Sequence, residues 1–255
     1  MNLFKKIKKL FSLSPGEIML LSKDVLFTKN DENITRLIRL ARKLRTEKDQ
    51  TPLIIDIGAF DGQTSILFTK AFPSSKILAF EPNPEAFEIA KKNLTPYPNV
   101  TLNNIAISDK TGEAQFNVTL NKVSSSLNKL NTEAIDQQQQ EQTSVVKKIT
   151  VPTRALDELK IDQEILIMKI DVQGHEKAVI TGGKNTLKNT RFILVEMNNH
   201  SMYSGSSRYY DVDVLLRENN FKLADMIITY RKDGILVSEY DAIYINRLKY
   251  PEIGA

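Results

Sequence analysis

The stretch from Leu53 to Gly62, which reads LIIDIGAFDG, places the strongest constraint on how this chain can fold. Four apolar residues surround Asp56, and the run passes directly into a turn between Gly58 and Gly62. An apolar run of this length before a glycine turn predicts a parallel strand that is buried on both faces. The glycines would let backbone amides approach a ligand closely at the start of the next helix. We therefore expect an α/β fold with a ligand site at the end of this strand.

A second apolar segment, Lys76–Phe80, ends in the acidic residue Glu81, which follows Gly58 by 23 residues. In nucleotide-binding α/β folds, an acid at the tip of the second strand binds ribose hydroxyls about twenty residues after the glycine turn. The two segments together predict a cofactor that contains adenosine.

The glycine turn indicates which adenosine cofactor to expect. A dinucleotide fingerprint needs G-x-G-x-x-G, whereas this turn is Gly58-x-x-x-Gly62, with Asp56 at the strand end and Asp61 in the loop. Two carboxylates would repel a pyrophosphate, but they suit a ligand that carries an ammonium and a sulfonium. S-adenosylmethionine is the common adenosine cofactor of that description, and the sequence predicts it.

Six short motifs of this chain, in this order, resemble those of the FkbM-type S-adenosylmethionine-dependent methyltransferases. They are DIGAFDG from Asp56, FEPNP from Phe80, AISD from Ala106 with Gly112 after it, SSS from Ser124, KIDVQGHE from Lys169, and VE from Val195. The resemblance covers roughly residues 51–200. The chain departs from the family at Phe60, where Asn is usual, and at Gln173, where Glu is frequent.

The alternation of strands and helices, together with this resemblance, predicts an α/β, doubly wound, Rossmann-like fold of the class I methyltransferase type. We expect a mostly parallel seven-stranded sheet whose last strand is antiparallel, a β-hairpin insertion at about 113–151, and N-terminal helices. The methyltransferase domain would span 51–248, after a helical extension over 1–50. The expected strands are Leu53–Ile57, Lys76–Phe80, Val100–Ile107, Ile165–Val172, Phe192–Glu196, Phe221–Ile228 and Ala242–Asn246, with Gln115–Leu120 and Val145–Val151 as the inserted hairpin. The expected helices are Glu32–Arg45, Gln63–Ala71, Pro84–Leu94 and Tyr210–Asn219.

The glycine loop, the tip of the second strand and the turn after the third are the expected cofactor site. The resemblance places the adenine ring beside the turn at Ser108-Asp109, although Asp109 is equally well explained as a turn former. The candidate cofactor-binding residues are Asp56, Gly58, Ala59, Phe60, Asp61, Gly62, Thr64, Glu81, Pro82, Asn83, Ala106, Asp109 and Asp171. No metal site is expected.

Three residues at the ends of neighbouring strands are candidates for catalysis. Asp171 ends a strand that should lie beside the first one, so it would face the methyl group of the cofactor. His175 is a candidate general base because its unperturbed pKa lies near neutral, and Asp171 could orient it or contact the cofactor or acceptor. His175 could equally cap the helix that begins near Glu176. Glu196 is the competing base, or else a residue that holds a backbone amide or a lysine.

Composition excludes several other classes of site. The chain has no cysteine and only two histidines, which excludes disulfides, thiolate metal sites and a histidine-rich metal cluster. Of its net charge of +4, the first 50 residues hold +6, from twelve Lys and Arg against six Asp and Glu. The remainder is slightly acidic, so a basic groove around the site, and hence nucleic acid as a partner, is not expected.

The N-terminal segment Met1–Leu13 reads as a basic amphipathic helix, with apolar residues on one face and four lysines on the other. Such a helix can make weak contact with an anionic membrane surface; alternatively, it packs on the domain or frays. A secretory signal is not expected, because Ser12, Ser14 and Pro15 interrupt the apolar core. We expect a cytoplasmic protein, with peripheral membrane contact left open.

Three functions remain open at this point. The favoured one is an S-adenosylmethionine-dependent methyltransferase that acts on a hydroxyl oxygen of a small molecule, sugar or glycan. The second is a nicotinamide-dependent oxidoreductase on a similar sheet, which the missing third glycine and the acidic loop disfavour. The third is a catalytically silent relative that keeps the fold as a binding module.

Overall fold

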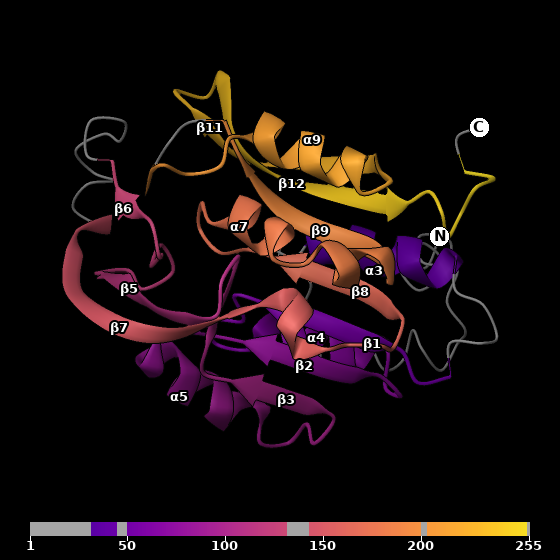
Figure 1. The fold of residues 1–255 in the computed structure, drawn as a ribbon, viewed down its shortest axis with the longest axis horizontal. Coiled ribbons are helices and arrows are strands. Elements are labelled where there is room, and N and C mark those ends of the chain that lie inside the picture. The colour runs from indigo at the N-terminus through magenta and orange to yellow at the C-terminus, as the bar shows by residue number, and fades with distance from the viewer. Residues whose placement is uncertain (1–31, 45–49, 132–142, 200–202, 254–255) are drawn as a thin grey trace, which may run out of the picture.

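A computed structural model describes residues 32–44, 50–131, 143–199 and 203–253 (Figure 1). The predicted helix at Met1–Leu13 and the four consecutive glutamines of the insertion, residues 137–140, lie outside these residues. No helix in the described ranges is long and apolar enough to cross a lipid bilayer.

The centre of the molecule is a seven-stranded sheet with the order β11-β12-β9-β8-β1-β2-β3. Strand β12 runs antiparallel to both of its neighbours, and the other pairings in the sheet are parallel. The predicted topology is therefore confirmed, including the contact between the first and fourth strands, β1 and β8. The strands are β1 Leu53–Ile57, β2 Lys76–Phe80, β3 Val100–Asn103, β8 Ile165–Ile170, β9 Thr190–Asn198, β11 Phe221–Lys232 and β12 Leu236–Asn246.

Helices cover both faces of this sheet, as a doubly wound fold requires. On the near face in Figure 1 lie α7 (Glu176–Thr181), α8 (Lys184–Lys188) and α9 (Tyr209–Glu218), which pack on β1, β8, β9 and β12. On the far face lie α3 (Glu32–Lys43), α4 (Gln63–Ala71) and α5 (Pro84–Leu94). Every residue of β1, β8 and β9 is buried between the two layers. This double coverage explains why these strands read as continuous apolar runs.

Helix α3 extends the core from the N-terminal side. It buries Ile34, Leu37, Ile38 and Ala41 against α4 and the sheet, with the periodicity expected from the sequence. Its polar side is tied to the edge strand by an ion pair between Arg36 and Asp225, with a separation of 3.0 Å. Residue 45, where we expected the helix to end, lies outside the described ranges.

A small second sheet projects from one side of the main sheet, at the left of Figure 1. Strand β5 (Gly112–Thr119) pairs antiparallel with the long strand β7 (Val145–Ala155), which confirms the predicted hairpin. Strand β4 (Ala106–Ser108) adds to the other side of β7. The two-residue strands β6 (Lys129–Leu130) and β10 (Tyr203–Ser204) pair with one another, so the insertion is joined to the segment that follows β9.

The prediction of one continuous strand over Val100–Ile107 is wrong. The chain leaves the main sheet after Asn103 and joins the small sheet at Ala106. At the break, the side-chain amide of Asn103 donates to the carbonyl of Ala79 at 3.2 Å, and that of Asn104 donates to the carbonyl of Glu81 at 2.8 Å. Hydrogen bonds from side chains to backbone compete with the backbone hydrogen bonds between strands, and here they accompany the change of direction between β3 and β4.

The glycine turn after β1 has a packing reason that the sequence did not reveal. Gly58 has φ +81°, and a Cβ atom there would lie 1.8 Å from the backbone oxygen of Asp171. Gly62 has φ +83°, and a Cβ atom there would press on the side chain of Leu94 at 3.0 Å. The first glycine thus lets the loop lie directly against the end of β8, and the second lets α5 pack beside it.

Replacing Gly58 by alanine should lower the free energy of unfolding by more than the strain of an alanine in the left-handed region alone. The matched control is Gly234→Ala, because Gly234 also has a left-handed φ of +69° but no atom of the described residues lies within 4 Å of the position that a Cβ would occupy. The control should lose about 1 kcal/mol, and Gly58→Ala at least about 2 kcal/mol more, because backbone must move. Urea unfolding of both variants measures this difference, and equal losses would contradict the close contact with Asp171.

Candidate active site

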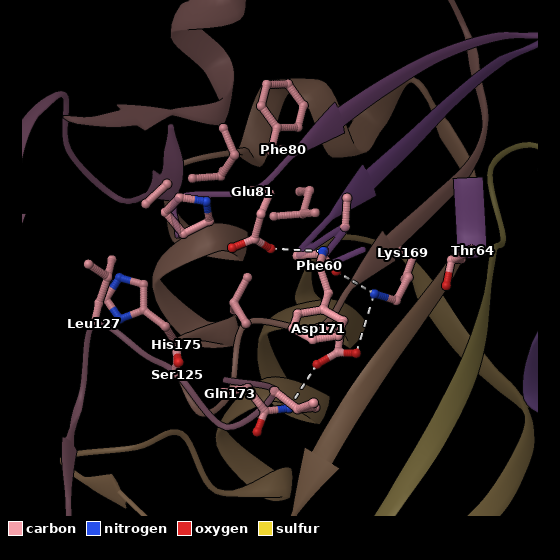
Figure 2. A pocket seen from close by; sticks show the side chains of 18 of the residues that line it. Phe60, Thr64, Phe80, Glu81, Ser125, Leu127, Lys169, Asp171, Gln173 and His175 are labelled. Atoms are coloured by element: carbon pink, nitrogen blue, oxygen red, sulfur yellow. Dashed lines mark hydrogen bonds and ion pairs between the residues drawn. The ribbon is translucent and has the colours of Figure 1, made fainter. Parts of the chain in front are cut away.

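A cavity of about 280 Å³ opens at the carboxyl ends of β1, β2 and β8 and beneath the insertion (Figure 2). Its wall combines carboxylates with apolar side chains from both sheets. The predicted site residues that line it are Gly58, Ala59, Phe60, Asp61, Thr64, Glu81, Pro82, Ala106, Asp171 and His175. The predicted residues outside its lining are Asp56, Gly62, Asn83, Asp109 and Glu196. The cavity lies where a doubly wound sheet places its ligands.

Glu81 holds the glycine loop and the start of α5 in place. Its carboxylate accepts hydrogen bonds from the backbone amides of Phe60 and Asn83, both at 2.8 Å. Each oxygen keeps a further lone pair, so the pair of oxygens can also accept bonds from two neighbouring hydroxyl groups. Burial raises the pKa of Glu81 to about 7, against the opposing effect of the two amide bonds.

The amides of the glycine loop are largely used within the protein. Gly58 and Ala59 both donate to the carbonyl of Phe80 at 3.0 Å, and Gly62 donates to the carbonyl of Ala59 at 2.8 Å. The amide of Phe60 is bound to Glu81. A pyrophosphate site needs several loop amides that point at the ligand, and this loop does not offer them at these four positions. The backbone therefore argues against a dinucleotide.

Phe60 itself takes a left-handed conformation, with φ +49°. Asn tolerates this region far better than Phe. This explains in physical terms why Asn is usual at this position in the resembling family, and it marks Phe60 as a departure that this chain accommodates.

Lys169 is a buried cation between the tips of β1 and β8, and sequence reasoning assigned it no role. Its ammonium donates to the carbonyl of Gly58 at 2.8 Å and pairs with Asp171 at 3.3 Å (Figure 2). It also pairs with Asp56 at 3.5 Å. Burial alone lowers the pKa of Lys169, but Asp171 and Asp56 outweigh burial and raise it. The signal available in the sequence was a lysine inside an apolar strand, which needs a charged partner.

The two aspartates on Lys169 differ in what they can reach. Asp56 is completely buried and accepts a hydrogen bond from the hydroxyl of Ser65 at 2.7 Å, behind the cavity wall. The side chain of Asp171 is 37% exposed and faces the cavity. Asp171 is therefore available to a ligand, whereas Asp56 holds the lysine.

His175 lies on the other side of the cavity from Lys169, close to the insertion (Figure 2). Its Nε2 lies 2.9 Å from the hydroxyl of Ser108, and its Nδ1 lies 3.2 Å from the side-chain oxygen of Asn128. Because the amide nitrogen of Asn128 donates to Gly174 at 2.7 Å, its oxygen faces His175 and Nδ1 must donate to it. The hydroxyl of Ser108 that faces Nε2 also donates to Oδ1 of Asp109 at 3.1 Å. Burial lowers the pKa of His175, against the charge of Asp109.

Two predictions about His175 are not met by this geometry. Asp171 does not orient it, because the described partners of the ring are Ser108 and Asn128. His175 occupies the N-cap position of α7, but its side chain makes no capping bond. The residue instead connects the turn after β4 to the insertion.

Glu196 lies behind Asp171, at the end of β9. It accepts hydrogen bonds from the side chain of Gln173 at 3.0 and 3.1 Å and from that of Asn198 at 3.4 Å, so its partners in the described part of the chain include neither a backbone amide nor a lysine. Burial raises the pKa of Glu196 well above its usual value, and the charge of Asp171 raises it further.

The insertion supplies the upper wall of the cavity, through Phe116, Lys122, Val123, Ser125 and Leu127. Lys122 is held by an ion pair of 2.7 Å with Glu85 at the start of α5. The sequence analysis gave Ser124–Ser126 only as a motif and named none of these side chains as site residues, because only the folded hairpin brings them to the cavity.

The raised pKa of Glu81 predicts a pH dependence of stability in the cofactor-free protein. The folded state retains the proton of Glu81 up to about pH 7, whereas the unfolded chain loses it near 4.5, so the free energy of unfolding should fall as pH rises through this window. Glu81 alone should contribute about 2 kcal/mol less at pH 8 than at pH 5.5. Urea unfolding of wild type and Glu81→Gln at both pH values measures this contribution. The variant should show the smaller change, and an identical change in both proteins would contradict the assignment.

The sheet order, the carboxylate at the tip of β2 and the acidic cavity together define a nucleotide-cofactor protein of the doubly wound class. A family model, the methyltransferase FkbM domain, matches residues 56–223, which is more than half of the chain. The chain belongs to the FkbM methyltransferase family.

Two relatives of known activity are similar to this chain. The 2-O-methyltransferase NoeI of Sinorhizobium fredii is 32% identical over 164 residues, which cover 60% of this chain and 66% of NoeI. The hexuronic acid methyltransferase AglP of Haloferax volcanii is 27% identical over 162 residues, which cover 62% of this chain and 60% of AglP. The chain therefore aligns with less than two thirds of either relative's length.

Among solved structures, the methyltransferase FkbM of Methylobacillus flagellatus superposes with a TM-score of 0.45 at 10% identity. That superposition covers 89% of this chain and 58% of the other.

Proposed function

We propose that this protein is an S-adenosylmethionine-dependent methyltransferase that methylates a hydroxyl oxygen of a sugar, a glycan or another small hydroxylated molecule. The observation that carries the proposal is the acidic cavity of an FkbM-family domain whose loop amides are already bonded within the protein. A cationic adenosine cofactor fits these residues, and a dinucleotide does not.

The residues of the cavity suit the parts of S-adenosylmethionine. Glu81 would accept hydrogen bonds from the ribose hydroxyls, and the apolar wall at Ala106 and Ile107 would receive the adenine ring. The carboxylates of Asp61 and Asp171 complement the positive charges of the ligand. When bound, the cofactor supplies a methyl group on a sulfonium, and the carbon–sulfur bond breaks as the acceptor oxygen bonds to the methyl carbon.

The choice of a hydroxylated acceptor is supported by the two relatives, whose names specify 2-O-methylation and a hexuronic acid. The cavity walls formed by the insertion and by the loop after β8 are where such an acceptor would lie. The larger contribution of the protein is to hold the acceptor oxygen close and aligned; removal of the hydroxyl proton is the smaller one.

We assign the removal of that proton to Asp171. Its side chain faces the cavity, whereas Glu196 lies outside the lining and has a raised pKa. His175 also lines the cavity, but its two ring nitrogens lie within hydrogen-bond distance of Ser108 and Asn128. His175 is better suited to hold the Ser108-Asp109 turn, beside which the family resemblance places the adenine ring.

Replacing Asp171 and His175 separately should distinguish these roles. Asp171→Asn should lower kcat by about 10²-fold or more, because proton transfer by a positioned side chain contributes that much. The affinity for S-adenosylhomocysteine, which has no sulfonium charge for Asp171 to complement, should change by less than about fivefold. His175→Ala should mainly weaken cofactor binding. The readouts are kcat and calorimetric Kd. If Asp171→Asn loses affinity and His175→Ala loses only turnover, the two assignments are reversed.

The proposed function is tested by titrating the purified chain with S-adenosylmethionine, S-adenosylhomocysteine and, as the control, NADH. We expect micromolar binding of the first two and none of NADH. Incubation with S-adenosylmethionine and a panel of mono- and oligosaccharides should then give a product heavier by one methylene group in mass spectra. Binding of NADH alone would favour the oxidoreductase, and binding of no ligand would favour a catalytically silent module.

A further inference from the structure

Gln173 occupies a constrained position in the loop between β8 and α7. Its backbone is left-handed, with φ +55°, although it is not glycine and has no short polar side chain that would favour this region. Such strain persists only where the surroundings impose it, and it gathers at functional sites. The side chain of Gln173 also lines the cavity (Figure 2).

The side-chain amide of Gln173 bridges two carboxylates. Its Nε2 donates to Oδ1 of Asp171 at 2.9 Å and to the carboxylate of Glu196 at 3.0 and 3.1 Å. The amide nitrogen has two hydrogens, one for each carboxylate, and both are used. The two acceptors also determine which way the amide faces, because a flipped amide would present an oxygen to both carboxylates.

Oδ2, the other oxygen of Asp171, lies 3.3 Å from Lys169. Asp171 is thus held on both oxygens, by a cation from the end of β8 and by a neutral donor from the loop. A neutral donor adds no charge to this side of the cavity, whereas a glutamate at position 173 could donate to Asp171 only when protonated.

Gln173 is itself fixed from the far side. Its Oε1 lies 3.1 Å from the hydroxyl of Tyr203, a buried residue of β10. Its backbone carbonyl accepts a hydrogen bond of 2.7 Å from the hydroxyl of Ser126 in the insertion. The side chain of Gln173 therefore has little conformational freedom. Through these contacts, the position of Asp171 depends on the position of the insertion.

We propose that Gln173 is a positioning residue that holds the carboxylate of Asp171 in the orientation in which it receives the proton of the acceptor hydroxyl. The inference rests on the proposed function and extends it to a residue with no contact to the proton itself. Gln173 acts through Asp171, so removing its side-chain amide should lower kcat only in a protein that still has the Asp171 carboxylate.

The test is a double-mutant cycle of Gln173→Leu and Asp171→Asn, with Gln163→Leu as the matched control. Gln163 makes the same kind of side-chain bond, a donation of 3.0 Å to the carbonyl of Thr51, but it lies at the opposite end of the sheet. Gln173→Leu should lower kcat at least tenfold, with Kd for S-adenosylhomocysteine and KM for S-adenosylmethionine within twofold of wild type. Gln163→Leu should leave all three constants unchanged.

The cycle separates positioning from a general structural role. If Gln173 acts through Asp171, the double variant should turn over no more slowly than Asp171→Asn alone, within about twofold. Independent, multiplicative losses would overturn the proposal, as would an unchanged kcat in Gln173→Leu. Gln173→Met, which also lacks the donor but is unbranched, replaces the leucine variant if that variant does not fold.

A crystal structure of the Gln173 variant bound to S-adenosylhomocysteine tests the positioning without any turnover. We expect the carboxylate of Asp171 to leave its orientation or to occupy several. An unmoved Asp171 would overturn the proposal even if the protein is an active methyltransferase. Failure of wild type to transfer methyl groups would instead count against the proposed function, while the orientation of Asp171 would still decide the role of Gln173.

Discussion

The cavity at the carboxyl ends of β1, β2 and β8 depends on one buried ammonium group. Lys169 is a donor at the junction of β1 and β8, and its three acceptors are the carbonyl of Gly58 and the carboxylates of Asp56 and Asp171. Removing it would leave a buried carboxylate without its counter-charge, which is among the costlier changes a folded protein can undergo. The same group fixes where the glycine loop begins and where the exposed carboxylate of Asp171 lies, so the geometry of the cavity follows from it.

Much of the fold could be predicted because its core strands are buried on both faces. The bounds of β1, β2, α4 and α5 agree with the sequence prediction, since apolar runs and helix-start signals such as Asn83-Pro84 mark them locally. The third strand could not be predicted correctly. Whether Asn103 and Asn104 continue a strand or turn it depends on carbonyl groups of β2 and of the turn after it, which come from another part of the chain.

The site was predictable to a similar degree. Motifs indicated Glu81, Asp171 and the glycine loop, and Glu81, Asp171 and the loop residues from Gly58 to Asp61 line the cavity. The partners of these residues were not predictable, because Lys169, Gln173 and Asn128 act through contacts with residues distant in the sequence. The prediction of His175 as a base came from its intrinsic pKa and its position beside a strand tip, whereas the structure adds the contacts of its two ring nitrogens with Ser108 and Asn128.

The central claim is that this cavity holds an adenosine cofactor that carries a positive charge, with Glu81 at the ribose. A crystal structure of the chain soaked with S-adenosylhomocysteine tests it most directly. We expect both ribose hydroxyls to lie within hydrogen-bond distance of the Glu81 carboxylate and the adenine ring to lie against Ala106 and Ile107. A ligand bound elsewhere, or one whose ribose does not contact Glu81, would contradict it.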